Sequence, residues 1–175
     1  ASTADDITPF RAIMNDMYAK DISKKIKSVK RDKQRKGQFI GGKPMYGYKM
    51  HPTEKNKIVI DEEVAPVVRR IFAMALEGIS CRQIAVRLNE ENIPTPATYA
   101  GLNLGTRGAY SGLWSSERIS EMLRNETYIG HMVQGRTVKI SYKSKKCLMQ
   151  PPESWVVVKN THEPLIDEET FQKVQ

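Results

Sequence analysis

The side chains best suited to chemistry in this sequence are cations, and they are concentrated in one stretch. Residues 20–49 hold 11 Lys or Arg residues against two Asp residues, whereas the rest of the chain has 17 basic and 18 acidic residues. A local excess of this size is typical of a surface that binds a polyanion such as nucleic acid. A solvated helix face without a partner is the alternative at this stage.

The end of this basic stretch has features of a segment that enters a DNA groove. A helix is about 10 Å wide and the minor groove about 6 Å, so only an extended chain can enter that groove. The double glycine has no side chains to clash, and the Lys-Pro pair after it adds a cation and an extended bias. A plain interdomain hinge is the alternative. The residues predicted to contact the DNA backbone or minor groove are Lys24, Lys27, Arg31, Arg35, Lys36, Gly41, Gly42, Lys43 and Lys145.

A second group of polar residues lies on a helix predicted to begin after Trp114. Ile119, Met122 and Leu123 define its inner face, and at about 100° per residue the opposite face is polar. A helix fits the major groove, where Arg and Asn can read base edges. A merely solvated helix is again the alternative. The predicted major-groove residues are Ser116, Glu117, Arg118, Ser120, Glu121, Arg124 and Asn125.

No pattern in the sequence predicts catalysis, a metal or a cofactor. Nucleophilic catalysis needs a nucleophile partnered by a base, and the usual motifs for hydrolases, phosphate loops and zinc proteases do not occur. The two cysteines and three histidines lack the spacing of zinc ligands. Two cysteines so far apart favour a reducing compartment, and no run approaches the roughly 18 apolar residues of a membrane span. We therefore expect a cytoplasmic, non-membrane protein.

The elements that must position these residues follow from apolar spacing and capping signals. Thr8-Pro9 opens a helix that no Gly or Pro interrupts before Gly37. The other predicted helices run from near Ala65-Pro66 to Leu76 with Gly78 as the stop, from a capping box at Ser80–Gln83 to near Asn92, after Ser115, and after Asp167. The residues predicted to face inward on the first two of these helices are Val67, Val68, Ile71, Phe72, Ala75, Ile84, Ala85 and Leu88. The predicted strands are Lys57–Ile60 and a long hairpin from Tyr128–Tyr142 and Trp155–Lys159, with linkers or loops over 38–52, 97–112 and 143–152.

These elements predict a mainly α protein with a small β-hairpin, in the α+β class. We expect a long helical arm over residues 1–37 and a winged-helix or helix-turn-helix-like domain over residues 38–175. The loop over 97–112 is longer than the turn of an ordinary helix-turn-helix, which weakens that assignment.

The sequence resembles the large serine recombinases of mobile elements and phages. The resemblance lies in an ordered set of segments that covers nearly all of the chain. They are PFRAIMNDMYAKDISKKIKSVKRDKQRKGQFIGGKPMYGYKM, VVRRIFAMALEGISCRQIAVRLNEENIPTP, WSSERISEMLRNETYIGHMVQGR and THEPLIDEETFQKVQ. Each segment alone is loose, but the set in this order is specific.

The resemblance implies a role in site-specific recombination. In that family a serine attacks a DNA phosphate, and a tetramer exchanges strands. The nucleophile would lie upstream of Ala1 and the zinc ribbon beyond Gln175, so this chain alone should be inactive. It would supply the long helix between subunits, a linker in the minor groove and a DNA-binding domain for attachment sites. From the residues alone, a transcription regulator with a basic arm or an RNA-binding protein remains an alternative.

Overall fold

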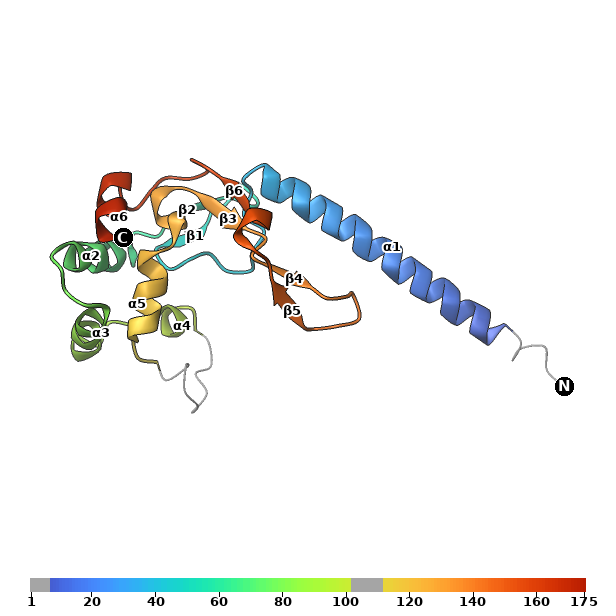
Figure 1. The fold of residues 1–175 in the computed structure, drawn as a ribbon, viewed down its shortest axis with the longest axis horizontal. Coiled ribbons are helices and arrows are strands. Elements are labelled where there is room, and N and C mark those ends of the chain that lie inside the picture. Colours follow the sequence, from blue (N-terminus) through green and yellow to red (C-terminus); the bar gives the residue numbers. More distant parts are fainter. Residues whose placement is uncertain (1–6, 102–111) are drawn as a thin grey trace. The chain divides into compact units, whose positions relative to one another are not determined.

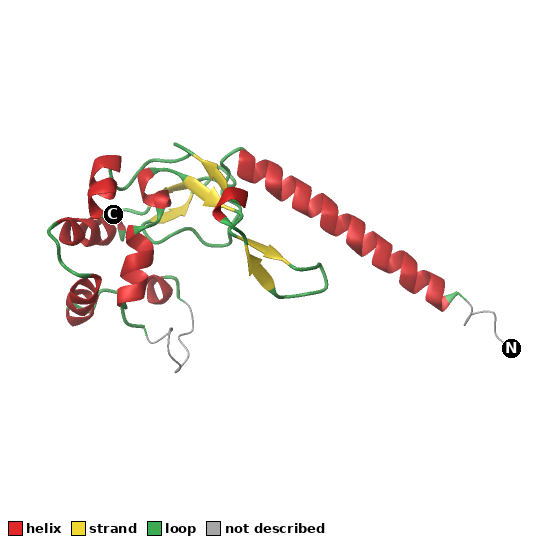
Figure 2. Ribbon diagram, in the orientation of Figure 1, coloured by secondary structure: helices red, strands yellow, loops and turns green. Residues whose placement is uncertain are grey.

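The computed structural model describes residues 7–101 and 112–175, and the chain forms two compact units (Figure 1). The first unit combines the segment that ends at Ile40 with Met132–Val158. The second combines Gly41–His131 with Lys159–Gln175. The mainly helical class with small antiparallel hairpins is confirmed (Figure 2).

In the first unit, α1 (Thr8–Arg35) is the predicted long helix of 28 residues. Its start differs in one respect: Ile7, and not Thr8, is the N-cap residue. Gly37 ends the helix with φ +68°, and its N–H donates to the Gln34 carbonyl at 2.9 Å. No residue of α1 is buried. Within the described ranges, no helix is long and apolar enough to cross a bilayer.

The predicted hairpin is present in the first unit as two antiparallel ladders, but the predicted loop over 143–152 is wrong in part, because Cys147–Met149 is a strand. β3 (Met132–Gln134) pairs with β6 (Val156–Val158), and β4 (Thr137–Lys139) pairs with β5 (Cys147–Met149). A 3-10 turn, η3 (Pro152–Ser154), separates the two strands on the returning arm.

The prediction that the first strand begins at Tyr128 is wrong. Residues Glu126–Ile129 form a 3-10 helix, η2, because the Asn125 side chain accepts a hydrogen bond from the Thr127 N–H at 3.0 Å. Gly130 then turns the chain with φ +86°.

Side-chain contacts explain why the hairpin belongs to the same unit as α1. The Lys143 ammonium and the Tyr142 hydroxyl each lie 2.5 Å from Oδ1 of Asp16 on α1. The Gln134 amide accepts from the Ile40 N–H at 3.2 Å and donates to the Gln38 carbonyl at 2.8 Å. The hairpin had been expected as the wing of a domain over 38–175, and that winged-helix arrangement stays a prediction.

The second unit contains a short hairpin and six helical segments in its described part. In chain order they are β1 (Tyr48–Met50), β2 (Ile58–Ile60), α2 (Ala65–Leu76), α3 (Cys81–Glu90), α4 (Pro96–Tyr99), α5 (Ser116–Leu123), η2 and α6 (Glu168–Val174). The predicted caps on α3, α5 and α6 are all present, from Ser80, Ser115 and Asp167.

The core of the second unit lies between α2, α3, α5 and η2. Its fully buried large side chains are Val68, Ile71, Phe72, Ile84, Leu88, Ile119 and Tyr128. The predicted inner faces of the three helices are largely right. On α2, however, Met74 is buried, whereas Val67 and Ala75, which had been expected inside, are only half-buried.

The expectation of a linker throughout 38–52 is wrong at its end, because Tyr48–Met50 is a strand. The expected loop over 97–112 is wrong at its start, where α4 covers Pro96–Tyr99, and its residues 102–111 lie outside the described residues. Tyr46 and Tyr48 are buried, as expected for residues that anchor the chain to the next domain. Gly47 between them has φ +99°, and a Cβ there would lie 2.7 Å from Cδ1 of Leu165 and 3.0 Å from Cγ2 of Val68. Only glycine fits this position without strain.

We expect Gly47→Ala to lower the free energy of unfolding by about 1–3 kcal/mol, because it adds both backbone strain and a steric overlap. Gly42→Ala is the matched control. A Cβ at Gly42 would meet no atom within 4 Å, and the expected change is within about 0.5 kcal/mol. Urea unfolding of both variants measures the difference. Equal stability of the two would contradict the packing argument.

Candidate nucleic-acid interface

The basic half of α1 has one clearly defined cationic face. Lys20, Lys24, Lys27, Arg31 and Arg35 are separated by four, three, four and four residues. At about 100° per residue they fall within a sector about 80° wide. All five are exposed. With a rise of about 1.5 Å per residue, Lys24 and Arg35 are about 16 Å apart along the axis, enough to contact several phosphates.

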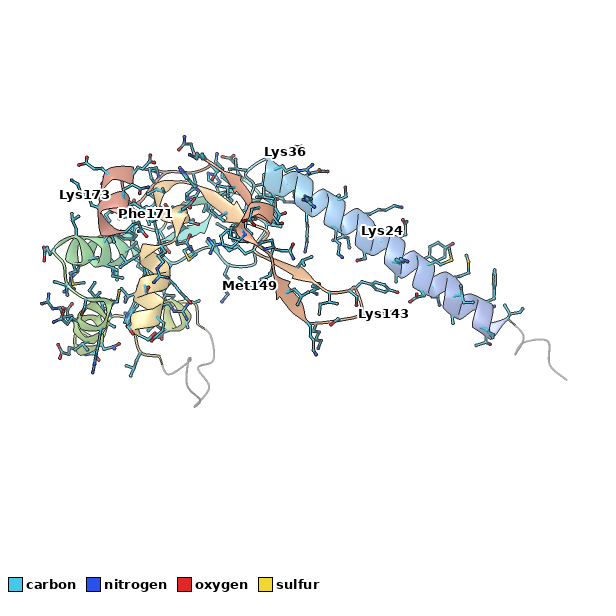
Figure 3. All side chains as sticks on the ribbon, viewed as in Figure 1. Lys24, Lys36, Lys143, Met149, Phe171 and Lys173 are labelled. Atoms are coloured by element: carbon cyan, nitrogen blue, oxygen red, sulfur yellow. The ribbon has the colours of Figure 1, made fainter. Side chains whose placement is uncertain are left out.

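The other four cations of this region, Lys25, Lys30, Lys33 and Lys36, lie off that face. Lys25 forms a salt bridge with Asp21 at 2.9 Å. Lys36 is the C-cap residue of α1, about 100° from Arg35 (Figure 3). The predicted set of Lys24, Lys27, Arg31 and Arg35 is therefore one stripe, and Lys36 lies beside it.

The hairpin carries a second group of cations in the first unit. Lys145 was predicted, and Lys139, Lys143 and Lys146 are also exposed. Lys143 is labelled in Figure 3. Its ammonium is held by Asp16, and this carboxylate raises the pKa of Lys143 above its ordinary value. Only Lys145 was predicted to contact DNA. The closely spaced Lys143, Lys145 and Lys146 form a local cluster of positive charge that would have predicted the whole group.

The glycine segment begins the second unit. The Lys43 ammonium donates to the Ala100 carbonyl at 3.0 Å, so this cation is used within the unit here. Gly42 is exposed and has open space around its Cα. Gly41 is also exposed. Sterically, the two glycines offer the bare main chain that a groove contact requires.

The inner side of α5 is fixed against α3. Ile119 on α5 and Ile84 and Leu88 on α3 are completely buried. The start of α5 is held by Asn89, which forms two hydrogen bonds with the main chain of Trp114. Asn89 is not predictable from the sequence, because its partner is 25 residues away and no local pattern indicates the contact.

The outward side of α5 presents charges of both signs. Arg118, Glu117, Glu121 and Arg124 are exposed. Nη1 of Arg118 lies 3.9 Å from Oε2 of Glu121. The pKa of Glu117 is lowered, because its carboxylate accepts first from its own backbone N–H and then from the hydroxyls of Ser115 and Ser116. With two cations and two anions, this face has no net charge at neutral pH.

Two other predicted residues of α5 have structural partners. The Ser120 hydroxyl accepts from Nη2 of Arg124 at 2.7 Å. Asn125 caps η2, and its Nδ2 lies 3.8 Å from the Met45 sulfur. Ser116, Ser120 and Asn125 are all half-buried, so the most accessible groups on this face are the charged ones.

A polar cluster borders the segment that carries Lys43. The Tyr99 hydroxyl lies 2.9 Å from both the Asp61 and the Glu63 carboxylates, and Lys49 lies 3.4 Å from Asp61. The two carboxylates raise the pKa of Tyr99, the Glu63 contact being the larger cause. The cluster ties α4 to the start of α2. A cavity of about 330 Å³ adjoins it, and Tyr46 is among the lining residues.

Among residues 7–101 and 112–175, no three His, Cys, Asp or Glu side chains are grouped in a way that could hold a metal ion. Cys81 and Cys147 are free thiols. The candidate interface therefore consists of cations, an exposed glycine segment and a short helix with outward Arg side chains. These features can bind phosphates and read bases.

The fold of this chain is similar to that of two solved structures. One similar structure is described as "Crystal Structure of a LSR-DNA Complex", where LSR denotes a large serine recombinase. Its TM-score is 0.52 at 24% sequence identity, covering 86% of this chain and 36% of that chain. A second comes from "Sequence Requirements of the Listeria innocua prophage attP site", with TM-score 0.52, 24% identity, and coverage of 86% of this chain and 49% of that chain.

The two solved chains are thus much longer than this one, which spans less than half of either. A family model described as Recombinase matches residues 62–175, well over half of the chain. The match begins just before α2 and includes every helix of the second unit as well as the hairpin of the first. The chain therefore belongs to the Recombinase family.

Proposed function

We propose that this chain is the DNA-binding portion of a serine site-specific recombinase that integrates or excises a mobile element. Membership of the Recombinase family carries the proposal. The likeness in fold to a recombinase described in complex with DNA supports it. The cationic stripe on α1 supplies the charge that binding to a phosphate backbone requires.

Two kinds of contact are proposed, each using the residues placed above. The α1 stripe and the hairpin lysines bind phosphates, while Gly41, Gly42 and Lys43 follow the minor groove. The outward face of α5 reads base edges in the major groove through Arg118 and Arg124. The partner is duplex DNA at attachment sites, and the full-length protein assembles as a dimer or tetramer in the bacterial cytoplasm.

A competition experiment distinguishes the proposed binding to duplex DNA from binding to RNA. The major groove of A-form RNA is deep and narrow and does not admit a helix. Unlabelled duplex DNA selected from a random pool should displace labelled DNA at far lower concentration than A-form RNA of equal length. Equal displacement by both would refute base reading by α5.

We expect binding to duplex DNA to weaken steeply as salt is added. If about six cations contact phosphates, log K falls with log salt at a slope near −5, because each contact releases counterions. Lys27→Ala combined with Arg31→Ala should make the slope less steep by about 2. Lys25→Ala is the control, because Lys25 lies off the stripe and is paired with Asp21. Fluorescence anisotropy titrations over a salt series measure these slopes, and a wild-type slope near zero would refute the electrostatic role.

We expect Arg118→Ala or Arg124→Ala to weaken the selected duplex by about 1–3 kcal/mol and random duplexes by much less, because a bidentate contact between Arg and guanine is specific to the base. Lys173→Ala is a control of equal charge, since Lys173 pairs with Glu169 on α6 (Figure 3). Competition binding with both duplexes measures the ratio. Equal losses on the two duplexes would assign these arginines to the backbone alone.

We expect Gly42→Val to reduce affinity and to flatten any preference for A·T pairs between half-site and crossover. The added side chain finds open space in the protein, so the groove wall is the only surface that it should meet. The measurement compares binding to sites that differ only in A·T content, with thermal unfolding as the check on folding. Unchanged binding would make the segment a simple tether.

A further inference from the structure

The Asn89 side chain forms hydrogen bonds with the main chain of Trp114, just before α5. The Trp114 N–H donates to Oδ1 of Asn89 at 2.8 Å, and Nδ2 of Asn89 donates to the Trp114 carbonyl at 3.0 Å. One side-chain amide thus pairs with both polar groups of one main-chain residue. Asn89 is half-buried near the end of α3, and this partial burial limits the access of water that would compete for its hydrogen bonds with Trp114.

Trp114 is fixed at a third point as well. Its indole Nε1–H donates to the Ile93 carbonyl at 2.9 Å, just beyond α3. The ring is 4% exposed and meets the Tyr46 ring edge to face, with centroids 5.7 Å apart. The main chain and the side chain of Trp114 are therefore both tied to the end of α3.

The residue that follows Trp114 starts the proposed reading helix. Ser115 is the N-cap residue of α5, in an extended conformation with φ −123° and ψ 158°, and Arg118 follows within the first turn. A shift of Trp114 is transmitted directly to this turn. A slip of one residue would rotate the outward face by about 100° and move Arg118 away from the groove.

Apolar packing alone does not prevent such a slip. The α5 helix has only eight residues, and its inner face is Ile119, Met122 and Leu123. Hydrophobic burial is non-directional, so it fixes the distance between helices more firmly than their rotation. Hydrogen bonds are directional, and the pair from Asn89 supplies a fixed orientation.

We propose that Asn89 is a positioning residue for base reading, which sets the orientation of α5 without touching DNA. This inference rests on the proposed function, because it concerns how α5 discriminates between duplexes. It predicts a separation of effects. Loss of the Asn89 amide should reduce discrimination, whereas phosphate binding by the cations of α1 should be unaffected.

The test uses the chain described here and two duplexes, one enriched from a random pool by the wild-type chain and one of scrambled sequence. Asn89→Ala removes both hydrogen bonds. Asn89→Asp keeps an acceptor for the Trp114 N–H but presents a second oxygen to the Trp114 carbonyl. Val86→Ala is the control, a neutral change at an exposed position of α3. Amide hydrogen exchange at Trp114 reports the state of the hydrogen bond itself.

Asn89→Ala and Asn89→Asp should each lower the ratio of selected to scrambled affinity by about tenfold. The salt dependence and the affinity for the scrambled duplex should stay at wild-type values. The Trp114 amide should exchange faster in Asn89→Ala and remain protected in Asn89→Asp. Val86→Ala should match wild type throughout.

Several outcomes would overturn the inference. A folded Asn89→Ala variant with a fast-exchanging Trp114 amide and an unchanged ratio would do so, as would equal losses on both duplexes. If Asn89→Ala does not fold, Asn89→Asp decides, and failure of both to fold would make Asn89 a stability residue only. If the wild-type chain shows no preference between the two duplexes, the proposed function is overturned and this inference with it. If the wild-type chain prefers the selected duplex and the Asn89 variants keep the same preference, only this inference is overturned.

Discussion

The second unit depends on one buried hydroxyl, that of Tyr48. It accepts from the Leu165 N–H at 3.1 Å and lies 3.0 Å from the Glu163 carbonyl and 3.3 Å from that of Thr127. A phenol has one proton to donate, so the shorter contact to Glu163 takes it and the other is secondary. Burial raises the pKa of Tyr48, which keeps this proton in place across the physiological range. The strand that follows the glycine segment, η2 and the segment before α6 thus meet at one atom.

A second tyrosine contact helps to fix the chain directly after the exposed Gly41-Gly42 segment. The Tyr128 hydroxyl donates to the main-chain carbonyl of Tyr46 at 3.0 Å in a buried site. The Tyr46 side chain is buried as well, and this burial raises the pKa of its phenol to about 12. Gly47 allows both tyrosines to turn inward, because its φ is positive and its Cα lies against Leu165. Full burial therefore begins at Tyr46, after the exposed residues Gly41 and Gly42. If Gly41 and Gly42 contact DNA, the residues that follow them are held in place, because Tyr46 and Tyr48 are buried in the second unit.

Local signals predicted most of the helices, and long-range pairing accounts for part of what was missed. The Ser80 capping box and the stop at Gly78 depend on neighbours in sequence, so the pattern alone was sufficient for α2 and α3. The strand at Tyr48–Met50 was missed because its partner strand, not its own composition, makes it a strand. The candidate cations were found as a charge excess, but the amide contacts of Asn89 and Gln134 join residues 25 or more positions apart and leave no sequence pattern.

The two sides of α1 impose a further constraint on any assembly. Ile22, Ile26 and Val29 lie on the side opposite the cationic stripe, with Lys25 and Lys33 beside them, and each of the three apolar side chains is more than half exposed. A helix can bind phosphate on one side and an apolar surface on the other only if the two partners approach from opposite directions. The stripe should therefore stay available to DNA when the apolar side is covered, as it would be in the proposed dimer or tetramer. Because the outward face of α5, counted with Arg124, carries no net charge, the proposed binding would depend on α1 and the hairpin for its long-range attraction to DNA. The proposed reading by α5 would then act only at short range.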